Sequence, residues 1–311
     1  MKPFTVAEST LNKLQQTLLN NMAVLAGKRV VLVDYPFYHN LGDWLIYHGT
    51  LHLLKQLRVE VIRQYCLADY QALLTSELPP DVALVLQGGG NFGDIYPTHQ
   101  QLRREVIKHF KSHTIVMMPQ SIHFNQPESF NEDAELFAQH GDLHLHVRDH
   151  ASLAFLQQFP ALNSQLTPDI AYMLSNQLPG LANPQKVPRS ASDTLMFRRR
   201  DVESTDSANG ADVNGFDWCD VFTRTYYFQY RCIRWLISAE RRLPLYPCAP
   251  YLWQRATTAQ IAIAVDYFNR FQCVDTDRLH GMILATMLRL PVVARDNSYG
   301  KLARFKQAWL D

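Results

Sequence analysis

The chain has 311 residues, of which 47% are hydrophobic and 19% are charged, and this balance indicates a folded protein with buried cores and excludes a disordered one. Its net charge of +1 and its pI of about 7.7 argue against a general nucleic-acid binder, which usually carries excess positive charge. The five cysteines form no CxxC pair, so we expect reduced thiols in a cytosol and neither a disulfide framework nor a zinc site.

Residues 1–21 have the pattern of an amphipathic helix. They lack the continuous apolar core and the cleavage site of a signal peptide. No stretch of the chain reaches about 18 uninterrupted apolar residues, the length that a membrane-spanning helix needs. The sequence therefore predicts neither a secretion signal nor a transmembrane helix.

The first half of the chain alternates short apolar runs with helix-favouring segments. The predicted strands are 29–34, 59–63, 82–87, 114–118 and 143–148, with a last run at 166–170. The predicted helices are 43–57, 70–76, 100–110, 132–139 and 151–159. Strands that are continuously apolar and separated by helices are typical of a parallel sheet covered on both faces.

The second half follows residues 176–192, whose Pro, Asn, Ser and Gly content is typical of a linker. Its predicted strands are 194–197, 271–276 and 291–294, its predicted helices are 220–242, 256–271 and 282–290, and 201–217 is an expected exposed loop. We therefore predict an α/β fold of two Rossmann-like, doubly wound lobes, residues 1–175 and 193–311, with a ligand site in the cleft between them.

The pentapeptide DRLHG at 277–281 stands between a predicted strand and a predicted helix. Free backbone N–H groups and the dipole at a helix N-terminus favour an anion there. Arg278 adds a planar guanidinium that fits a phosphate or carboxylate, and His280 adds a side chain that can release a proton near neutral pH. Lys301, on the loop after the next strand, could reach the same crevice. This corner predicts a small phosphorylated acid as ligand, and a packed histidine is the alternative for His280.

Residues 87–94, QGGGNFGD, follow a predicted strand, and Gly88, Gly90 and Gly93 match the GxGxxG pattern of dinucleotide sites. Two features oppose that function: the next strand ends in Pro-Gln without an acidic residue for a ribose, and Pro97 is a poor residue for a helix interior. A tight turn with positive φ is a second interpretation. We favour a third, in which the glycine backbone forms a floor that a sugar or phosphate approaches closely.

Other polar residues follow predicted strands and should share the rim where parallel strands end. Asn40, Gly42 and Asp43 lie in one such loop. Asp94 ends another, and its carboxylate and that of Asp43 could bind sugar hydroxyls or accept a proton from one. A helix N-cap is the alternative role for Asp43.

Gln120, Ser121 and Arg148 also follow strands, and a structural salt bridge is an equal alternative for Arg148. Ser121 lacks the GxSxG elbow of a serine hydrolase. Arg198–Arg200 ends the first strand of the second half, where such a run is either a solvated basic loop or an anion site opposite DRLHG. The remaining histidines show no metal-binding spacing, so no metal site is predicted.

Taken in order, these motifs resemble those of the polysaccharide pyruvyl transferases, most of all the exopolysaccharide-type members of bacteria. The matching motifs are NLGD (40–43), QGGGNFGD (87–94), PQS (119–121), VRD (147–149), PD (168–169), RRD (199–201), DRLHG (277–281) and DNSYGK (296–301). The resemblance covers about residues 29–305, almost the whole chain.

The resemblance implies a GT-B-like fold and an enzyme that moves a pyruvyl group from phosphoenolpyruvate to two hydroxyls of a saccharide, leaving a pyruvate ketal and phosphate in exopolysaccharide or capsule synthesis. It implies that His280 is the general acid. The implied donor-binding residues are Arg199, Arg278, Leu279 and Lys301. The implied cleft and acceptor residues are Asn40, Gly42, Asp43, Gly88, Gly89, Gly90, Asn91, Asp94, Gln120, Ser121 and Arg148. Phosphoenolpyruvate is a substrate here, and no cofactor is expected.

Two other functions remain open: a GT-B glycosyltransferase that uses a nucleotide sugar, and a non-catalytic saccharide-binding protein. The second half shows no clear site for a base and ribose, which disfavours the first, and the intact Arg278, His280 and Lys301 argue against the second. Residues 223–251 mix aromatic side chains with arginines, as interfacial helices do, so a further hypothesis adds peripheral contact between this cytoplasmic protein and the inner face of its membrane. A core helix with snorkelling arginines is the alternative.

Overall fold

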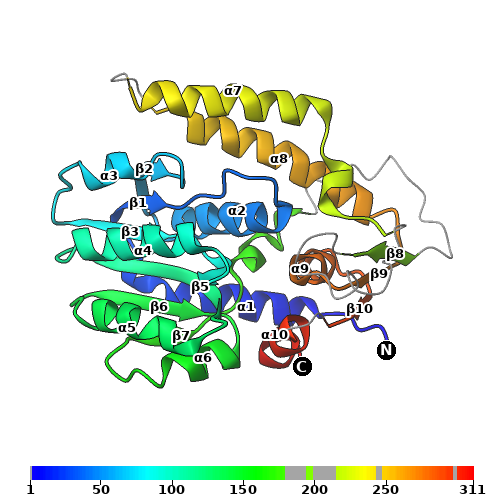
Figure 1. The fold of residues 1–311 in the computed structure, drawn as a ribbon. Helices are drawn as coiled ribbons and strands as arrows, with labels where there is room; N and C mark the ends of the chain where they lie inside the picture. The colour runs from blue at the N-terminus through cyan, green and yellow to red at the C-terminus, as the bar shows by residue number, and fades with distance from the viewer. Residues whose placement is uncertain (1, 179–193, 199–214, 243–246, 297–299) are drawn as a thin grey trace.

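Two parallel β-sheets with helices packed around them make up the protein (Figure 1). The structure is a computed structural model that describes residues 2–178, 194–198, 215–242, 247–296 and 300–311. All pairings between the described strands are parallel, and helices separate most of them along the chain. The predicted α/β class is therefore confirmed.

The first sheet runs β2-β1-β3-β5-β6-β7 in space, and β4 pairs with β5 beside this path. Its strands are β1 (Arg29–Val33), β2 (Glu60–Tyr65), β3 (Val82–Leu86), β4 (Gly89–Gly93), β5 (Ile115–His123), β6 (Leu143–Val147) and β7 (Ser164–Leu166). The helices of this half are α1 (Glu8–Asn21), α2 (Leu41–Gln56), α3 (Gln71–Leu74), α4 (Pro97–His109), α5 (Asn131–Ala138) and α6 (His150–Leu156). Three short 3₁₀ helices accompany them: η1 (Ala23–Leu25), η2 (Pro127–Phe130) and η3 (Ile170–Leu174).

Alternate side chains of the central strands enter different cores, because successive residues of a strand point to opposite faces of the sheet. In β1, Val30 and Leu32 belong to the core that contains α1, α2 and η3. Val31 and Val33 belong to the core that contains α3, α4, α5 and α6. Both faces of the sheet are therefore apolar and covered, and the polar residues of a site are left to the strand ends.

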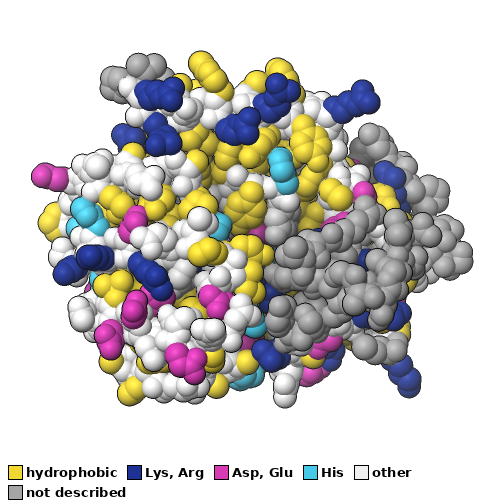
Figure 2. Space-filling view, in the orientation of Figure 1, with side chains coloured by type: hydrophobic (Ala, Val, Ile, Leu, Met, Phe, Trp, Pro, Cys, Tyr) yellow, Lys and Arg dark blue, Asp and Glu magenta, His cyan; other side chains and the backbone are white. Residues whose placement is uncertain are grey.

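The second sheet runs β10-β9-β8. Its strands are β8 (Thr194–Phe197), β9 (Cys273–Thr276) and β10 (Val292–Ala294). The helices of this half are η6 (Trp218–Val221), α7 (Arg224–Glu240), α8 (Ala249–Phe268), α9 (Leu279–Met287) and α10 (Lys301–Trp309). Helices α7 and α8 pack against each other, and basic and hydrophobic side chains line the upper edge of the molecule there (Figures 1 and 2). Among the described helices, none combines the length and the apolar character needed to cross a bilayer.

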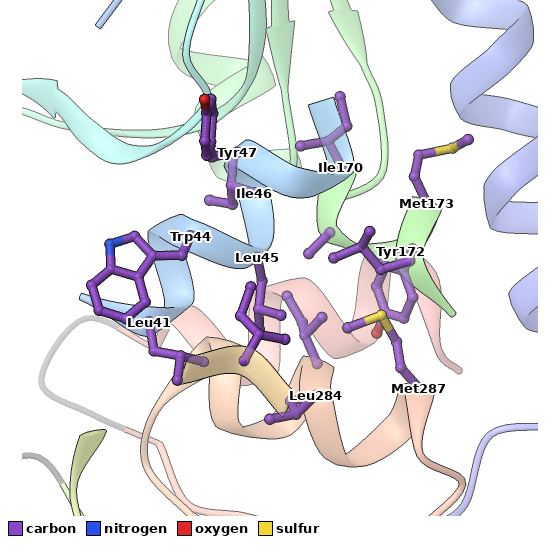
Figure 3. Close-up of a cluster of buried hydrophobic side chains, with 14 of the residues drawn as sticks. Leu41, Trp44, Leu45, Ile46, Tyr47, Ile170, Tyr172, Met173, Leu284 and Met287 are labelled. Carbon is purple, nitrogen blue, oxygen red and sulfur yellow. The ribbon is translucent and has the colours of Figure 1, made fainter. Parts of the chain in front are cut away.

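One apolar core joins the two sheets. Helix α2 packs against both η3 and α9, so that side chains from the two halves of the chain point into one cluster (Figure 3). Its labelled members are Leu41, Trp44, Leu45, Ile46, Tyr47, Ile170, Tyr172, Met173, Leu284 and Met287. Burying one such leucine or methionine contributes about 1.5–3 kcal/mol. The cluster therefore holds the first turn of α9 in a defined place relative to the first turn of α2.

Each end of the chain contacts elements of the opposite half of the chain. Phe4 exchanges two backbone hydrogen bonds with Val292 of β10, at 3.0 and 2.8 Å, before the chain enters α1. At the other end α10 packs against α6, and the Trp309 indole Nε1 donates to the Arg148 carbonyl at 2.9 Å. The termini thus add a second connection between the sheets, beside the shared core.

Two predictions about the glycine segment are wrong. Residues 87–94, predicted as a loop, contain strand β4, which pairs with β5. Pro97, which we expected to oppose a helix, is the first residue of α4. The missing N–H of a proline is harmless at that position, because the first N–H groups of a helix have no intrahelical partner anyway.

Other predicted elements are present with shifted ends. The helix predicted at 256–271 begins at Ala249, with Pro250 in its first turn. The helix predicted at 282–290 begins at Leu279. The division into two lobes stays a prediction, and most of the predicted linker lies outside the described residues.

Gly49 provides a test of the packing between α2 and η3. A Cβ at this position would lie 2.3 Å from the Ile170 carbonyl oxygen. We predict that Gly49→Ala lowers the free energy of unfolding by about 1–3 kcal/mol, although alanine is the better helix former. Equilibrium unfolding in urea measures this free energy. The control is Gly141→Ala, whose new Cβ meets nothing within 4 Å and should change stability by less than about 0.5 kcal/mol. Equal effects of the two substitutions would contradict the packing described.

Candidate active site

A cavity of about 750 Å³ lies where the end of strand β1 and the start of α2 meet the second half of the chain. Several sequence-predicted residues line it: Asn40, Asp43, Gly90, Asn91, Arg148, Arg278, Leu279, His280 and Lys301. The wall also includes residues that we did not predict: Asp34, Tyr38, Tyr96, His99, Trp218, Tyr230 and Arg234. Residues far apart in the sequence therefore share one cavity of a size suited to small-molecule ligands.

The first turn of α2 holds the Asp43 carboxylate in the cavity wall. Asn40 is the N-cap, and its Oδ1 accepts from the Gly42 N–H at 3.0 Å. Asn40 Nδ2 and the Tyr38 hydroxyl both donate to Asp43 Oδ2, at 2.8 and 3.1 Å. The N-cap alternative that we considered for Asp43 is therefore wrong, because Asn40 takes that role. Burial raises the pKa of Asp43, and the nearby His280 and Tyr38 offset only part of this rise, so the carboxylate is a better proton acceptor than an exposed one.

The first turn of α9 carries His280 into the cavity. Arg278 is the N-cap residue with an extended backbone, so Leu279 and His280 are the first helical residues. The ring of His280 lies against Gly42, where a Cβ would come within 2.5 Å of Nδ1. Gly42 is therefore a contact position that lets the two helix starts approach, and its own backbone is not part of the cavity wall.

A buried carboxylate, Asp169, joins His280 to Arg148. Arg148 Nη1 lies 2.6 Å from Asp169 Oδ2, and His280 Nε2 lies 3.4 Å from the same oxygen. The side chains of Arg148 and Asp169 are only 3% and 1% exposed. Burial alone would raise the pKa of Asp169, but His280 and Arg148 outweigh it and hold that pKa well below the usual range. Asp169 therefore stays ionised, and its contact orients the ring of His280.

Arg278 has a defined orientation as well. Its Nη2 lies 2.5 Å from Asp217 Oδ2, and its guanidinium carbon lies 6.0 Å from the centre of the Phe197 ring. Lys301 begins α10 and reaches the same cavity. Arg199 lies outside the described residues, and its neighbour Arg198 forms an ion pair with Asp275 at 2.7 Å. The cavity thus brings together four arginine and lysine side chains, those of Arg148, Arg234, Arg278 and Lys301.

An aspartate–histidine pair stands in the wall beside Tyr38 and Tyr96. His99 Nδ1 lies 2.8 and 2.9 Å from the two carboxylate oxygens of Asp34. Both residues are buried, and Asp34 has a φ of 67°, a backbone conformation that is uncommon for any residue but glycine. An aspartate that orients a histidine in this way is a recurrent arrangement for proton transfer. The sequence offered one signal that we did not use: Asp34 directly follows the apolar residues of β1.

Three more of the predicted cleft residues, Gly88, Gly89 and Asp94, are not part of the cavity wall. Gly88 packs against the Pro119 carbonyl, and Gly89, with a φ of 130°, approaches Asp43. The Asp94 carboxylate accepts from the Asn125 backbone and side chain, at 2.7 and 3.1 Å.

Gln120 and Ser121 are buried and are not part of the cavity wall either. Gln120 donates to the Gln87 carbonyl at 2.9 Å. The Ser121 hydroxyl donates to Asp149 and accepts from Arg148 Nε, at 2.8 and 3.0 Å. Through these hydrogen bonds, Gln120 and Ser121 orient the side chain of Arg148 and the ends of β3 and β5. Within the described ranges, no group of three or more His, Cys, Asp or Glu side chains is arranged to hold a metal ion.

Comparison with known proteins gives consistent matches. The family model of the polysaccharide pyruvyl transferases matches residues 40–299. The Bacillus subtilis (strain 168) protein named "Putative pyruvyl transferase EpsO" is 32% identical over 91% of this chain and 85% of its own length. "Pyruvyl transferase 1" of Schizosaccharomyces pombe is 30% identical over 91% of this chain and 70% of its own length.

A solved structure shares the fold. A functionally uncharacterized protein of Klebsiella pneumoniae matches with a TM-score of 0.62, covering 95% of this chain and 93% of its own. Its sequence is 18% identical, so this likeness concerns the fold alone.

Asp169→Asn tests the buried ion-pair network. The contribution of Asp169 to stability is present above about pH 4, the pKa expected in the unfolded chain, and it is lost as the pH falls through the lowered pKa of the folded state. We predict that Asp169→Asn destabilises by about 3–5 kcal/mol at pH 7, because it leaves Arg148 buried without its partner. The difference from the wild type should shrink below about pH 4.

Denaturant titrations at pH 7 and at acidic pH measure this difference. The control is Asp81→Asn, which breaks the exposed Arg29–Asp81 pair and should change stability little. An Asp169→Asn variant as stable as the wild type at pH 7 would show that the network does not stabilise the fold.

Proposed function

This chain belongs to the polysaccharide pyruvyl transferase family, and from that membership we propose that it moves a pyruvyl group from phosphoenolpyruvate to two hydroxyls of one saccharide. The products are a pyruvate ketal and inorganic phosphate, in exopolysaccharide or capsule synthesis. The observation that carries the proposal is the cavity in which Arg278 and His280, from one helix start, lie with Arg148 and Lys301.

The donor is an anion at both ends, with a phosphate and a carboxylate. We propose that Arg278, Lys301 and the N-terminal backbone of α9, at Leu279, bind these groups. Asp217 holds the guanidinium of Arg278 in place for this contact. Arg199 stays a proposed donor ligand outside the described residues. No cofactor or metal takes part in the proposed reaction.

His280 is the proposed general acid. Protonation of the methylene carbon of phosphoenolpyruvate turns it into a methyl group and makes the neighbouring carbon electrophilic, so that a sugar hydroxyl can add to that carbon. A second hydroxyl of the same sugar then attacks the carbon, phosphate leaves with the bonding electrons, and the ketal ring closes. Asp169, at 3.4 Å from His280 Nε2, stabilises the imidazolium from which the proton comes.

The two hydroxyls must lose their protons, and we propose His99 as the base for one of them. The Asp34 carboxylate fixes Nδ1 of His99, which leaves Nε2 as the atom that accepts a proton. Asp43, with its raised pKa, is the proposed second acceptor. One proton returns to His280, and the other leaves to phosphate or water, so the proton count of the reaction balances.

The architecture fits a two-substrate cleft. We propose that the two sheets are the two lobes of a GT-B-like fold, that the cavity is the cleft between them, and that the acceptor approaches from the side of Asp43, Asn91 and His99. The protein would act in the cytoplasm, with its acceptor carried on a lipid at the inner face of the membrane.

His280→Asn is the direct test of the activity. Wild-type protein, phosphoenolpyruvate and a panel of saccharides should release phosphate and yield a pyruvylated sugar detectable by mass spectrometry. We predict that the variant loses about 10²–10⁴-fold in kcat, the usual contribution of a general acid, and still binds phosphoenolpyruvate in calorimetry. His144→Asn, outside the cavity, is the matched control. Binding of a nucleotide sugar without binding of phosphoenolpyruvate would favour a glycosyltransferase instead.

His99→Gln and Asp34→Asn test the proposed base. The base must be deprotonated and His280 must be protonated, so wild-type kcat should fall on both the acid and the alkaline side. We predict that His99→Gln lowers kcat by about 10²-fold or more, moves the fall on the acid side to lower pH, where Asp43 becomes protonated, and leaves donor affinity unchanged. Asp34→Asn should have a similar but smaller effect. A wild-type pH profile in His99→Gln would reject this role.

A further inference from the structure

The outer side of helices α7 and α8 carries an unusual concentration of exposed aromatic side chains. Among the described residues eight large hydrophobic side chains are exposed, and six of them belong to these two helices: Tyr227, Phe228, Trp235, Tyr251, Leu252 and Ile263. Trp235 is 73% exposed and Phe228 is 67% exposed. Exposed apolar side chains gathered on one face mark a surface that binds something.

The same two helices are rich in arginine. Six exposed arginines lie on them or just after α7: Arg224, Arg231, Arg234, Arg241, Arg242 and Arg255. In the part of the chain that the structure describes, none of the six forms an ion pair. Each helix has a single acidic residue, Glu240 or Asp266, and the Glu240 carboxylate accepts from the Cys248 N–H at 2.7 Å. Figure 2 shows this combination as dark blue and yellow side chains along the upper edge of the molecule.

The buried side of α7 accounts for only part of its aromatic residues. Tyr226, Ile233 and Ile237 face the core, at the spacing of one helical face. Tyr230 and Arg234 line the cavity, and the Tyr230 ring stacks on Phe37 with a centroid distance of 4.8 Å. A core helix with snorkelling arginines explains these contacts, but it does not explain aromatic rings that point away from the core. Helix α7 therefore has one side in the wall of the cavity and another side exposed.

We propose that the face formed by Phe228, Trp235, Tyr251 and the surrounding arginines binds the surface of an anionic phospholipid bilayer. Aromatic rings are favoured at the boundary between headgroups and acyl chains, and arginines are attracted to anionic headgroups. The basic charge of the face complements this surface, whereas a second copy of the chain would bring arginines against arginines. The binding does not depend on the proposed reaction. The purpose of membrane binding does rest on the proposed reaction. Tyr230 and Arg234 of α7 line the cavity, so a membrane-bound α7 would bring the cavity close to a lipid-linked acceptor.

The test is co-sedimentation of the full chain with vesicles of phosphatidylglycerol and phosphatidylcholine, compared with vesicles of phosphatidylcholine alone. We expect binding to the anionic vesicles only, weakened by salt. Two double variants should each reduce the apparent affinity by roughly tenfold or more: Phe228→Ser with Trp235→Ser, and Arg231→Glu with Arg242→Glu. The second has a matched control in Lys108→Glu with Lys111→Glu, which changes the charge equally near the end of α4 and should bind as the wild type does.

Three outcomes would overturn the proposal: no sedimentation with anionic vesicles, equal binding by wild type and both surface variants, or a dimer in sedimentation velocity that the serine variant dissociates. The last outcome would assign the face to a second copy of the chain. Vesicle binding is measured without turnover, so its failure is distinct from failure of the proposed activity. Phosphate release with a water-soluble acceptor should be unchanged in Arg231→Glu with Arg242→Glu, because neither residue lines the cavity.

Discussion

The buried carboxylate of Asp169 is the interaction on which the candidate site depends. It follows β7, it contacts Arg148 from the end of β6, and it contacts His280 from the first turn of α9, so one side chain links three elements from both halves of the chain. A charge with almost no exposure is stable only if its partners are close and charged, which requires all three elements to be in place together. The same contact fixes the ring of His280 in the cavity wall, so the constraint on folding and the proposed acid chemistry have one physical origin.

The apolar cluster of α2, η3 and α9 stabilises this arrangement, because it packs the two helices against each other. It contains side chains of α2 and α9, the two helices whose first turns carry Asp43 and His280. Glycine at positions 42 and 49 lets helix α2 approach its neighbours more closely than any larger residue would. The chain ends add two further connections, from Phe4 to β10 and from Trp309 to the backbone of Arg148. A two-sheet protein whose cavity lies at the junction needs such connections, because small shifts between the sheets would separate the two walls.

The sequence was informative where the chemistry is local. Continuous apolar runs predicted the parallel strands, and DRLHG predicted a helix start with Arg278 and His280, because strand, loop and helix are adjacent in the chain. Contacts between residues that are distant in the chain were not predicted from the sequence. The pair of Asp34 and His99 is separated by 65 positions, and Asp169 meets His280 over a still longer separation. The glycine segment was predicted as a loop because it follows a strand and matches a glycine-rich loop pattern, yet tertiary pairing with β5 makes it a strand. Gly88, Gly89, Asp94, Gln120 and Ser121 were predicted from their place after strands, which indicates the right edge of the sheet but not which side chains reach the cavity.

A crystal structure of the protein soaked with phosphoenolpyruvate would test the donor site and the role of His280 together. We predict the donor in the cavity, with its phosphate and carboxylate within hydrogen-bonding distance of Arg278, Lys301 and the N-terminal backbone of α9, and with its methylene carbon beside the His280 ring. Donor bound at another place, or bound in the cavity with His280 turned away from the methylene carbon toward Asp169 alone, would contradict this prediction.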